Sequence, residues 1–373
     1  MIDIRRATLE DKPKIFKFIQ NAYTNIWQYR IPDRWEWEFL KNPHLNSKDL
    51  PIFIAIDSDG EVIGQSCALI EEAKIGSEIY KIGWGVDAFV LPEYRGQGIG
   101  MQLQKANDEA RAIFMSLSMA KSVRKMKIRL GSTPIDPVPV YRRYQRLSVE
   151  VFHNTGAKNI EQDQMIQKGQ LILRLIKIVT KRFYFIFRNF LTDMSPNNLL
   201  HKKANDLVIA EVEMFPEDVD ELWEKISPRF YAIIKRDKNH LNWKYVDQPN
   251  IDYLKVIARR QGKICGYIIL RKGRYPERNF GMVSDIFVDP EDSQTICLML
   301  GYALDHFRKE KVTEIIAAST IQQYQSFLER HGFLKTGEEY PVIHSKVDGL
   351  KVEPGGWFLG NSDHDWDQYP MTR

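Results

Sequence analysis

Alternating runs of apolar and polar residues divide the chain into short strands and helices that recur in both halves. In the first half the pattern predicts strands over 52–56 and 62–70, around the turn Ser58-Asp59-Gly60. In the second half it predicts strands over 254–258 and 264–270, around Gln261-Gly262. A central hairpin among strands that alternate with helices indicates a mixed α/β sheet in each half.

The two halves also share local sequence. Residues 37–43 (WEFLKNP) match residues 243–249 (WKYVDQP), and residues 87–93 (DAFVLPE) match residues 285–291 (DIFVDPE). We interpret Trp37 and Trp243 as core anchors of the repeats, because both copies keep them.

The order of elements agrees between the copies as well. A strand and a helix are predicted to open each one, over 2–8 and 8–22 in the first and over 207–212 and 216–226 in the second. After the matched strand at 87–93, a helix is predicted over 101–118, a strand over 126–131 and then another helix. The corresponding later strand of the second copy is predicted over 314–318. The sequence therefore predicts one fold used twice.

A glycine-rich turn follows the first of these matched strands. Gly96, Gly98 and Gly100 alternate with other residues just before a predicted helix. Backbone N–H groups that converge at a helix N-terminus attract anions, and the positive end of the helix dipole adds to the attraction. The turn is therefore predicted to bind a phosphate or pyrophosphate. It has neither the spacing of a dinucleotide fingerprint nor the Lys-Ser/Thr pair of a P-loop.

The run Arg95-Gly96-Gln97-Gly98-Ile99-Gly100, directly after a strand that ends in V-L-P-E-Y, resembles the acetyl-CoA-binding motif of the GNAT N-acetyltransferase superfamily. The resemblance implies an N-terminal GNAT domain over 1–155 and a degenerate GNAT-like copy over 206–346. Between them lies a helical linker, 156–205, and a tail follows, 347–373. The fold class it implies is α/β, as two tandem acyl-CoA N-acyltransferase domains.

The same resemblance implies a set of cofactor contacts. In the family, the strand before the loop pairs with the pantetheine arm and the loop backbone holds the pyrophosphate. The residues at these positions here are Phe89, Val90, Leu91, Arg95, Gln97, Gly98, Ile99 and Gly100. Arg95 has an alternative role, capping the turn or pairing with Glu93. The implied co-substrate is acetyl-CoA, without a metal.

Catalytic roles also come from the resemblance. Asp87 occupies a strand position where many family members carry an acidic residue near the substrate amine, which makes it a candidate base. Its counterpart Asp285 favours a structural role equally, and Glu71 and Glu72 are the alternates. Tyr144, at the start of a partial Tyr-x-x-Leu-Gly-Phe pattern placed on a helix, is the candidate proton donor. Tyr141 is its alternate.

The second copy lacks the glycine loop, since Pro290 is followed by Glu291 and Asp292. We therefore expect one active site in each chain, for an acetyl-CoA-dependent N-acetyltransferase that acts on the primary amine of a small molecule. The alternatives are a non-catalytic acyl-CoA-binding sensor or scaffold, and an acyl or aminoacyl transferase with another donor.

Composition limits the compartment and the partners. The net charge of +4 is too small to argue for nucleic acid, and the start of the chain has no apolar signal core. The three cysteines have no metal-ligand spacing. A cytoplasmic protein is the resulting expectation.

Two segments outside the repeats remain. Residues 171–191 form a predicted helix with five basic residues in twenty-one. We expect this helix to pack on the protein or on a second subunit, with a homodimer as one outcome, and rank a membrane surface second. The tail around His364, Asp363, Asp365 and Asp367 is expected to be solvated, with an acidic tail near a cationic substrate and a metal site as alternatives.

Overall fold

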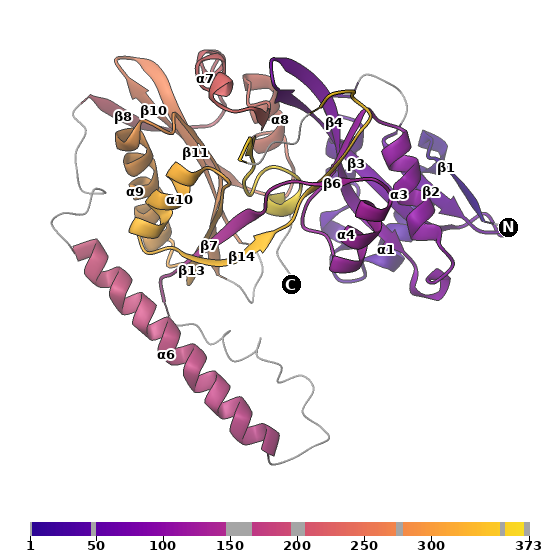
Figure 1. Cartoon of the computed structure of the whole chain (residues 1–373), viewed down its shortest axis with the longest axis horizontal. Coiled ribbons are helices and arrows are strands. Elements are labelled where there is room, and N and C mark those ends of the chain that lie inside the picture. The colour runs from indigo at the N-terminus through magenta and orange to yellow at the C-terminus, as the bar shows by residue number, and fades with distance from the viewer. Residues whose placement is uncertain are drawn as a thin grey trace. The chain divides into compact units, whose positions relative to one another are not determined.

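A computed structural model describes residues 2–45, 50–146, 166–194, 206–273, 279–350 and 355–368. The chain divides into two compact units that are not contiguous halves. The first unit takes residues 1–138, 213–252 and 338–369, and the second takes residues 139–212, 253–337 and 370–373. Each unit is built on one mixed sheet, so the two α/β sheets expected from the repeat are present (Figure 1).

Among the described residues, the sheet of the first unit has nine strands. Seven follow the order β1-β2-β3-β4-β5-β15-β6, while β9 pairs with β3 and β16 pairs with β9. Their bounds are β1 Asp3–Arg6, β2 Ile52–Ile56, β3 Val62–Ile75, β4 Glu78–Val90, β5 Ile113–Ser116, β6 Thr133–Pro134, β9 Ala232–Ile234, β15 Val342–Ser345 and β16 Trp357–Phe358.

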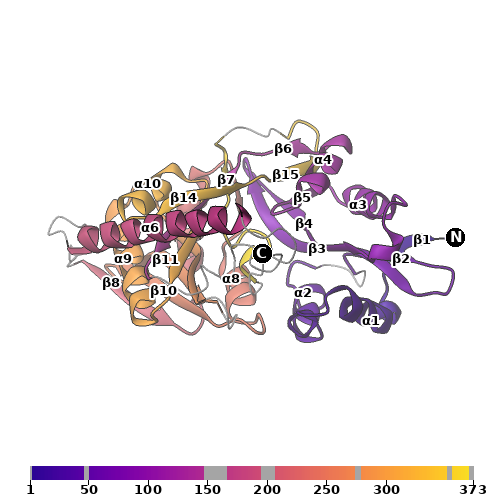
Figure 2. The same cartoon turned by 90° about the horizontal axis from the view of Figure 1, so that it is seen from below.

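Helices cover both faces of this sheet. α1 and α2 lie on one face and α3 and α4 on the other (Figure 2). The helices of the unit are α1 Lys12–Ala22, α2 Asp33–Phe39, α3 Ile99–Glu109, α4 Lys121–Arg129, α7 Val219–Ile226 and α8 Lys238–Tyr245. A capping box opens the 3₁₀ turn Leu9–Asp11 that precedes α1, and in it the Thr8 amide donates to Asp11 Oδ2 at 2.8 Å.

Among the described residues, the second sheet has seven strands, in the order β14-β7-β13-β12-β11-β10-β8. Their bounds are β7 Val138–Tyr144, β8 Leu207–Val212, β10 Tyr253–Arg260, β11 Lys263–Lys272, β12 Phe280–Val288, β13 Glu314–Ala318 and β14 Leu334–Glu339. α9 (Ser293–Lys309) and α10 (Gln322–Arg330) pack beside this sheet, and the long helix α6 spans Ile166–Met194 (Figure 1).

The repeats exchange strands. β7 follows β6 of the first sheet along the chain, but it pairs antiparallel with β13 in the second sheet. In return, β15 follows β14 of the second sheet and pairs antiparallel with β5 in the first. The compact units and the sequence repeats are therefore different pieces of chain.

Three local predictions were wrong. The helix expected over 101–118 ends at Glu109, and 113–116 is strand β5, because a short apolar run gives no period that separates strand from helix. The strand expected over 126–131 falls on α4 and the turn after it. Its alternating pattern misleads because the buried residue there is Lys127, whose Nζ lies 2.7 Å from Asp108 Oδ1. The helix expected next is strand β7.

Candidate acyl-CoA site

The glycine loop forms an open helix N-terminus. Gly96 and Gly98 have φ angles of 83° and 77°, which favour glycine, and α3 begins directly after Gly98. Within the described residues no side chain caps α3, and its first turn contains no carboxylate. The first amides of a helix have no partners within the helix. The predicted cluster of donors for an anion is therefore present at residues 98–100.

The glycine loop is held in place by its contacts with β3, α3 and the β2–β3 hairpin. Ile99 is 2% exposed and lies in a cluster with Ile63 and Leu103, so its backbone rather than its side chain is presented outward. Tyr94 donates its hydroxyl to Asp57 Oδ2 at 2.9 Å, which ties the turn to the β2–β3 hairpin. These two contacts fix the position of the loop relative to β2, β3 and α3.

The predicted pantetheine strand lies at the end of β4. Phe89 and Val90 are its last two residues, and Leu91 leads into the turn. Arg95 Nε donates to the Val90 carbonyl at 3.1 Å, and its guanidinium carbon lies 5.2 Å from the centre of the Phe89 ring. In the structure Arg95 therefore caps the end of β4, and its contact with a cofactor stays a prediction.

β4 and β5 separate just before this strand end. Their parallel pairing runs from Ile82 opposite Ile113 to Trp84 opposite Met115, whereas β4 continues to Val90. A bulge lies in the separated part, where the register between β3 and β4 shifts and Asp87 has a φ of 49°. The bulge at Asp87 and the uncapped N-terminus of α3 at Ile99 are therefore twelve residues apart in the sequence, joined by the end of β4 and the glycine loop.

Asp87 lies at the bulge and is paired with Arg30. The two side chains form an ion pair in which both are about nine-tenths buried. The Arg30 guanidinium also stacks on Tyr23, 3.7 Å from the ring centre, and burial raises the pKa of Tyr23 well above its ordinary value. This pairing gives Asp87 a clear structural role.

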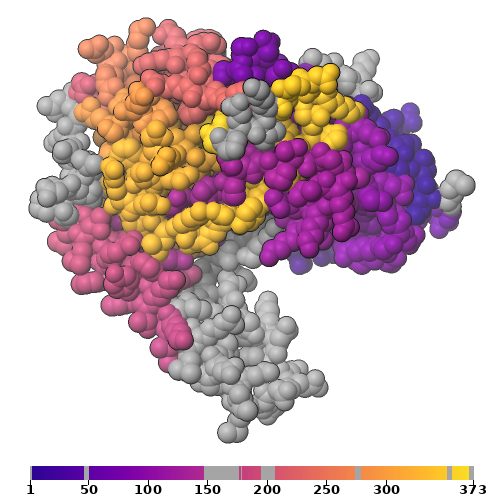
Figure 3. All heavy atoms as spheres, viewed as in Figure 1, coloured from indigo at the N-terminus to yellow at the C-terminus, as the bar shows by residue number. Residues whose placement is uncertain are grey.

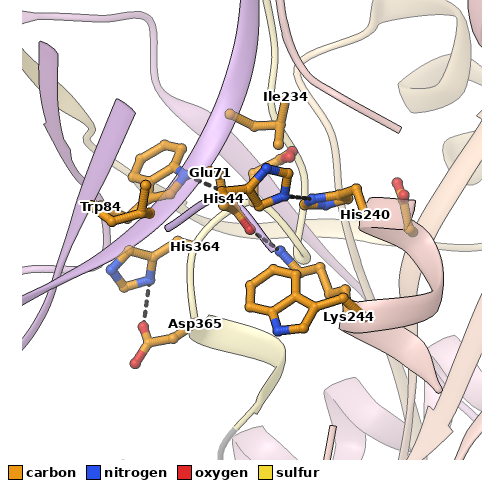
Figure 4. A network of polar contacts seen from close by, with 12 residues as sticks. His44, Glu71, Trp84, Ile234, His240, Lys244, His364 and Asp365 are labelled. Carbon is orange, nitrogen blue, oxygen red and sulfur yellow. Dashed lines mark hydrogen bonds and ion pairs between the residues drawn. The ribbon is translucent and has the colours of Figure 1, made fainter. Parts of the chain in front are cut away.

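The alternate carboxylates are also engaged. Glu71 is fully buried and accepts from Trp84 Nε1 at 2.9 Å and from Lys244 Nζ at 2.8 Å (Figure 4). Glu72 accepts from Lys235 Nζ at 3.0 Å. Each carboxylate therefore has a lysine as its counter-ion.

The C-terminal segment is the main feature that the sequence analysis missed. It was expected to be solvated, but its residues from Trp357 to Asp365 are buried in the first unit. His364 Nε2 lies 3.0 Å from the Gly85 carbonyl, one residue beyond the point where β4 leaves β5. His364 Nδ1 pairs with Asp365 Oδ1 at 2.6 Å. The apolar triplet 357–359 before the acidic run was the available signal.

Charge in this segment is balanced internally. Burial lowers the pKa of His364, but the Asp365 carboxylate outweighs burial and raises it overall. Burial likewise opposes ionisation of Asp365, yet His364 and the Arg34 guanidinium hold its pKa well below the usual range. Each partner thus favours the charged form of the other.

Glu38 is the exception among these carboxyls. It is 1% exposed, its Oε2 lies 3.4 Å from Arg34 Nε, and its Oε1 makes no hydrogen bond within the described residues. Burial, together with the charges of Asp87 and Asp365, raises the pKa of Glu38 to about 8. This raised pKa brings Glu38 toward the range of a base that works near neutral pH.

The two candidate tyrosines lie on a strand. Tyr141 and Tyr144 both belong to β7, in the second unit, so the helix placement that suggested Tyr144 was wrong. The Tyr141 hydroxyl donates to Glu329 Oε1 at 3.2 Å, and Arg182 stacks on the ring of Tyr144. α4, the helix that follows β5, contains no tyrosine. A catalytic role for either hydroxyl stays a prediction.

In the second unit, the N-terminus of α9 corresponds to that of α3, and a side chain caps it. α9 begins after Asp292, whose carboxylate accepts from the Thr295 amide at 3.1 Å and pairs with Arg260 at 2.7 Å. The Val288 amide, at the end of β12, donates to the Tyr324 hydroxyl at 3.0 Å. In the second unit, side chains of the chain itself thus accept hydrogen bonds from the amides of Thr295 and Val288, whereas the first amides of α3 have no side-chain cap among the described residues.

The described residues contain no group of three or more His, Cys, Asp or Glu arranged to hold a metal ion. Among them no helix has both the length and the apolar character needed to cross a bilayer.

Comparison with known proteins gives a family match for one segment of the chain. Residues 15–117 match the sequence profile of the acetyltransferase (GNAT) family. No curated protein sequence matches the chain.

Solved structures share the fold over nearly the whole chain. A GCN5-related N-acetyltransferase from Anabaena variabilis is 10% identical, with a TM-score of 0.59 over 92% of this chain and 72% of that one. A probable N-acyltransferase from Enterococcus faecalis is 12% identical, with a TM-score of 0.60 over 94% and 74%. The N-myristoyltransferase of Saccharomyces cerevisiae, with bound myristoyl-CoA, is 10% identical, with a TM-score of 0.56 over 92% and 79%. The match at 15–117 spans the β4–loop–α3 site, so this segment of the chain carries a GNAT acetyltransferase domain.

Proposed function

We propose that this protein transfers an acetyl group from acetyl-CoA to the primary amine of a small molecule, by direct attack of the amine on the thioester. The observation that carries the proposal is the open N-terminus of α3, which follows an αL glycine and has no capping side chain or first-turn carboxylate among the described residues. That arrangement suits a pyrophosphate. Binding energy from the distant phosphate end is available to orient the thioester for attack.

The proposal places one cofactor in each chain. At α9 the corresponding amides face the carboxylate of Asp292, and that charge repels a pyrophosphate. We therefore expect a single acetyl-CoA site, formed by the β4–α3 loop.

The proposal extends to activation of the amine. An alkylammonium with a pKa of about 10.4 is only about one part in 2,500 neutral near pH 7, so a base accelerates the reaction. Asp87 remains a candidate, although its pairing with Arg30 supports the structural role. Glu38 is the second candidate, because its pKa of about 8 suits a proton acceptor.

Calorimetry with acetyl-CoA tests the binding site. Gly98→Asp should abolish binding, because it puts a side chain on a φ of 77° and a negative charge beside the phosphate amides. Gly131→Asp is the matched control. Gly131 also has a positive φ, 95°, and a Cβ there meets nothing within 4 Å. Binding that survives Gly98→Asp, or two equal sites in each chain, would remove the proposed site.

An activity panel tests the chemistry. Acetyl-CoA and myristoyl-CoA are each offered with a series of small amines, and release of free CoA thiol is recorded. Turnover with acetyl-CoA that depends on the amine supports the proposal. Turnover with myristoyl-CoA but not with acetyl-CoA would show that the acyl donor is not acetyl-CoA. Tight binding without turnover on any amine would favour a sensor.

A further inference from the structure

α6 has two dissimilar sides. One side packs on the second unit through polar groups: Asn189 Nδ2 donates to the Tyr144 carbonyl at 3.1 Å, and Arg188 Nη2 donates to the Gly332 carbonyl at 3.2 Å. Asp193 pairs with Arg143 at 2.7 Å and with Arg308 at 3.2 Å. The expectation that this helix packs on the protein is therefore met by its polar side.

The other side carries large apolar side chains in solvent. Phe183, Phe187, Phe190 and Met194 follow each other at helical spacing, and each is more than half exposed. Tyr184, Leu191 and Ile176 are similarly exposed. We call these seven side chains the α6 apolar face; the helix lies at the molecular surface (Figure 3). Packing on the protein therefore leaves much of the apolar surface of this helix uncovered.

Positive charge accompanies the apolar face. The sequence of α6 contains six basic residues and one acidic residue, Asp193, and that residue is neutralised by two arginines. Lys177 and Lys181 are exposed, and their helical positions fall beside the apolar residues. An apolar stripe with aromatic rings, flanked by lysines, is the pattern of a helix that lies in the interface of an anionic bilayer.

We propose that α6 docks the protein on an anionic lipid surface, with the apolar face inserted at the headgroup boundary and the lysines on the phosphates. The helix lies flat rather than crossing the bilayer, because its other side is bound to the second unit through Asn189, Arg188 and Asp193. A second copy of the chain fits this face less well. Two such helices packed face to face would bring the same lysines together, with no exposed carboxylate on α6 to neutralise them.

Sedimentation of the full chain with vesicles tests the proposal. Mixed phosphatidylglycerol–phosphatidylcholine vesicles should carry the protein down at low salt, whereas pure phosphatidylcholine vesicles should carry much less. Raising the salt should weaken binding, since the Debye length falls from about 10 Å at 0.1 M to about 3 Å at 1 M. Lys177→Gln with Lys181→Gln should lower the partition coefficient about 25-fold, from roughly fivefold for each charge.

Variants of the α6 apolar face test whether this face binds a membrane or a second copy of the chain. Phe187→Asp with Phe190→Asp should abolish vesicle binding and leave the melting temperature unchanged, because both rings are already in solvent. Val208→Asp is the matched control, an exposed apolar residue on β8, and should bind like the native chain. Absence of binding to anionic vesicles overturns the proposal, as does binding that survives the double Phe variant. A concentration-dependent dimer that the same variant dissolves, without vesicle binding, assigns the face to a second copy instead.

Discussion

The indole rings of Trp37 and Trp243 stack nearly parallel in the first unit, with centroids 4.6 Å apart and planes 13° apart. Their contact is reciprocal. Trp37 Nε1 donates to the Trp243 carbonyl at 2.9 Å, and Trp243 Nε1 donates to the Trp37 carbonyl at 3.4 Å. The repeat-equivalent tryptophans therefore anchor one shared core, in a unit that takes chain from both repeats.

Trp243→Ala should destabilise the first unit by about 3–5 kcal/mol, because it leaves a cavity and removes the partner of Trp37. Urea denaturation followed by near-ultraviolet circular dichroism measures the loss. Trp27→Ala, at a half-buried tryptophan of the same unit, is the control and should cost less. Equal losses at the two positions would contradict a special role for the stacked pair.

Removal of Glu71 should unfold the first unit more readily, because it leaves the buried ammonium of Lys244 without its carboxylate. The expected loss for Glu71→Ala is about 3–5 kcal/mol. The double variant Glu71→Leu with Lys244→Met should recover much of it, since no buried charge remains. A double variant no more stable than Glu71→Ala would show that charge balance is not what holds this pair.

Because of Glu38, the free energy of unfolding should fall as pH rises toward 8. Its pKa is raised to about 8 in the folded protein, so the protonated carboxyl stabilises the fold at low pH. That contribution is lost as pH rises from the ordinary glutamate value, about 4.3, through 8. Glu38→Gln should flatten the fall of the melting temperature over this range. If Glu38 is also the base, the variant lowers kcat by about 10²- to 10⁴-fold.

His44 and His240 should make folding sensitive to acid. Their ring nitrogens lie 3.1 Å apart, and burial lowers the pKa of both imidazoles. The unfolded chain therefore takes up protons first, and stability is lost as pH falls below about 6.5, by at most about 1.4 kcal/mol per pH unit for each ring.

His364 acts in the opposite direction. Its raised pKa gives stability that is complete below about 6.5 and is lost as pH rises through its folded value. Thermal unfolding at a series of pH values separates the two effects. His240→Gln should reduce the loss of stability below pH 6.5, while His364→Gln should reduce the loss of stability as pH rises above 6.5. The reverse pattern would contradict both assignments.

Tyr144→Phe tests the predicted proton donor. A donor to the CoA thiolate acts in the transition state, so the change should lower kcat by about 10²- to 10⁴-fold with little effect on acetyl-CoA binding. Tyr141→Phe is the comparison. Its hydroxyl bonds Glu329, so a stability loss of about 1 kcal/mol without a loss of kcat is expected. Unchanged turnover in both variants would exclude both tyrosines.

Local features were predictable from the sequence. β2, β8 and β13 have the predicted bounds, and the glycine loop takes the expected form at Gly96 and Gly98. These depend on nearest-neighbour chemistry, such as side-chain alternation, positive φ and the free amides of a helix N-terminus. The absence of a glycine loop after Pro290 is likewise visible in the sequence, and Asp292 caps α9 there.

What the sequence by itself determined is therefore the α/β class, strands such as β2, β8 and β13, and the glycine loop before α3, because each is encoded within a few consecutive residues. Only the tertiary structure decided which strand completes which sheet, since β7 and β15 have no local property that reveals their exchange. It also decided the polar centre of the first unit. His364 reaches the Gly85 carbonyl across 279 positions of sequence, and the raised pKa of Glu38 arises from burial and from charges brought close by folding. Burial and charge depend on every packed neighbour, and no single segment of the chain contains that information.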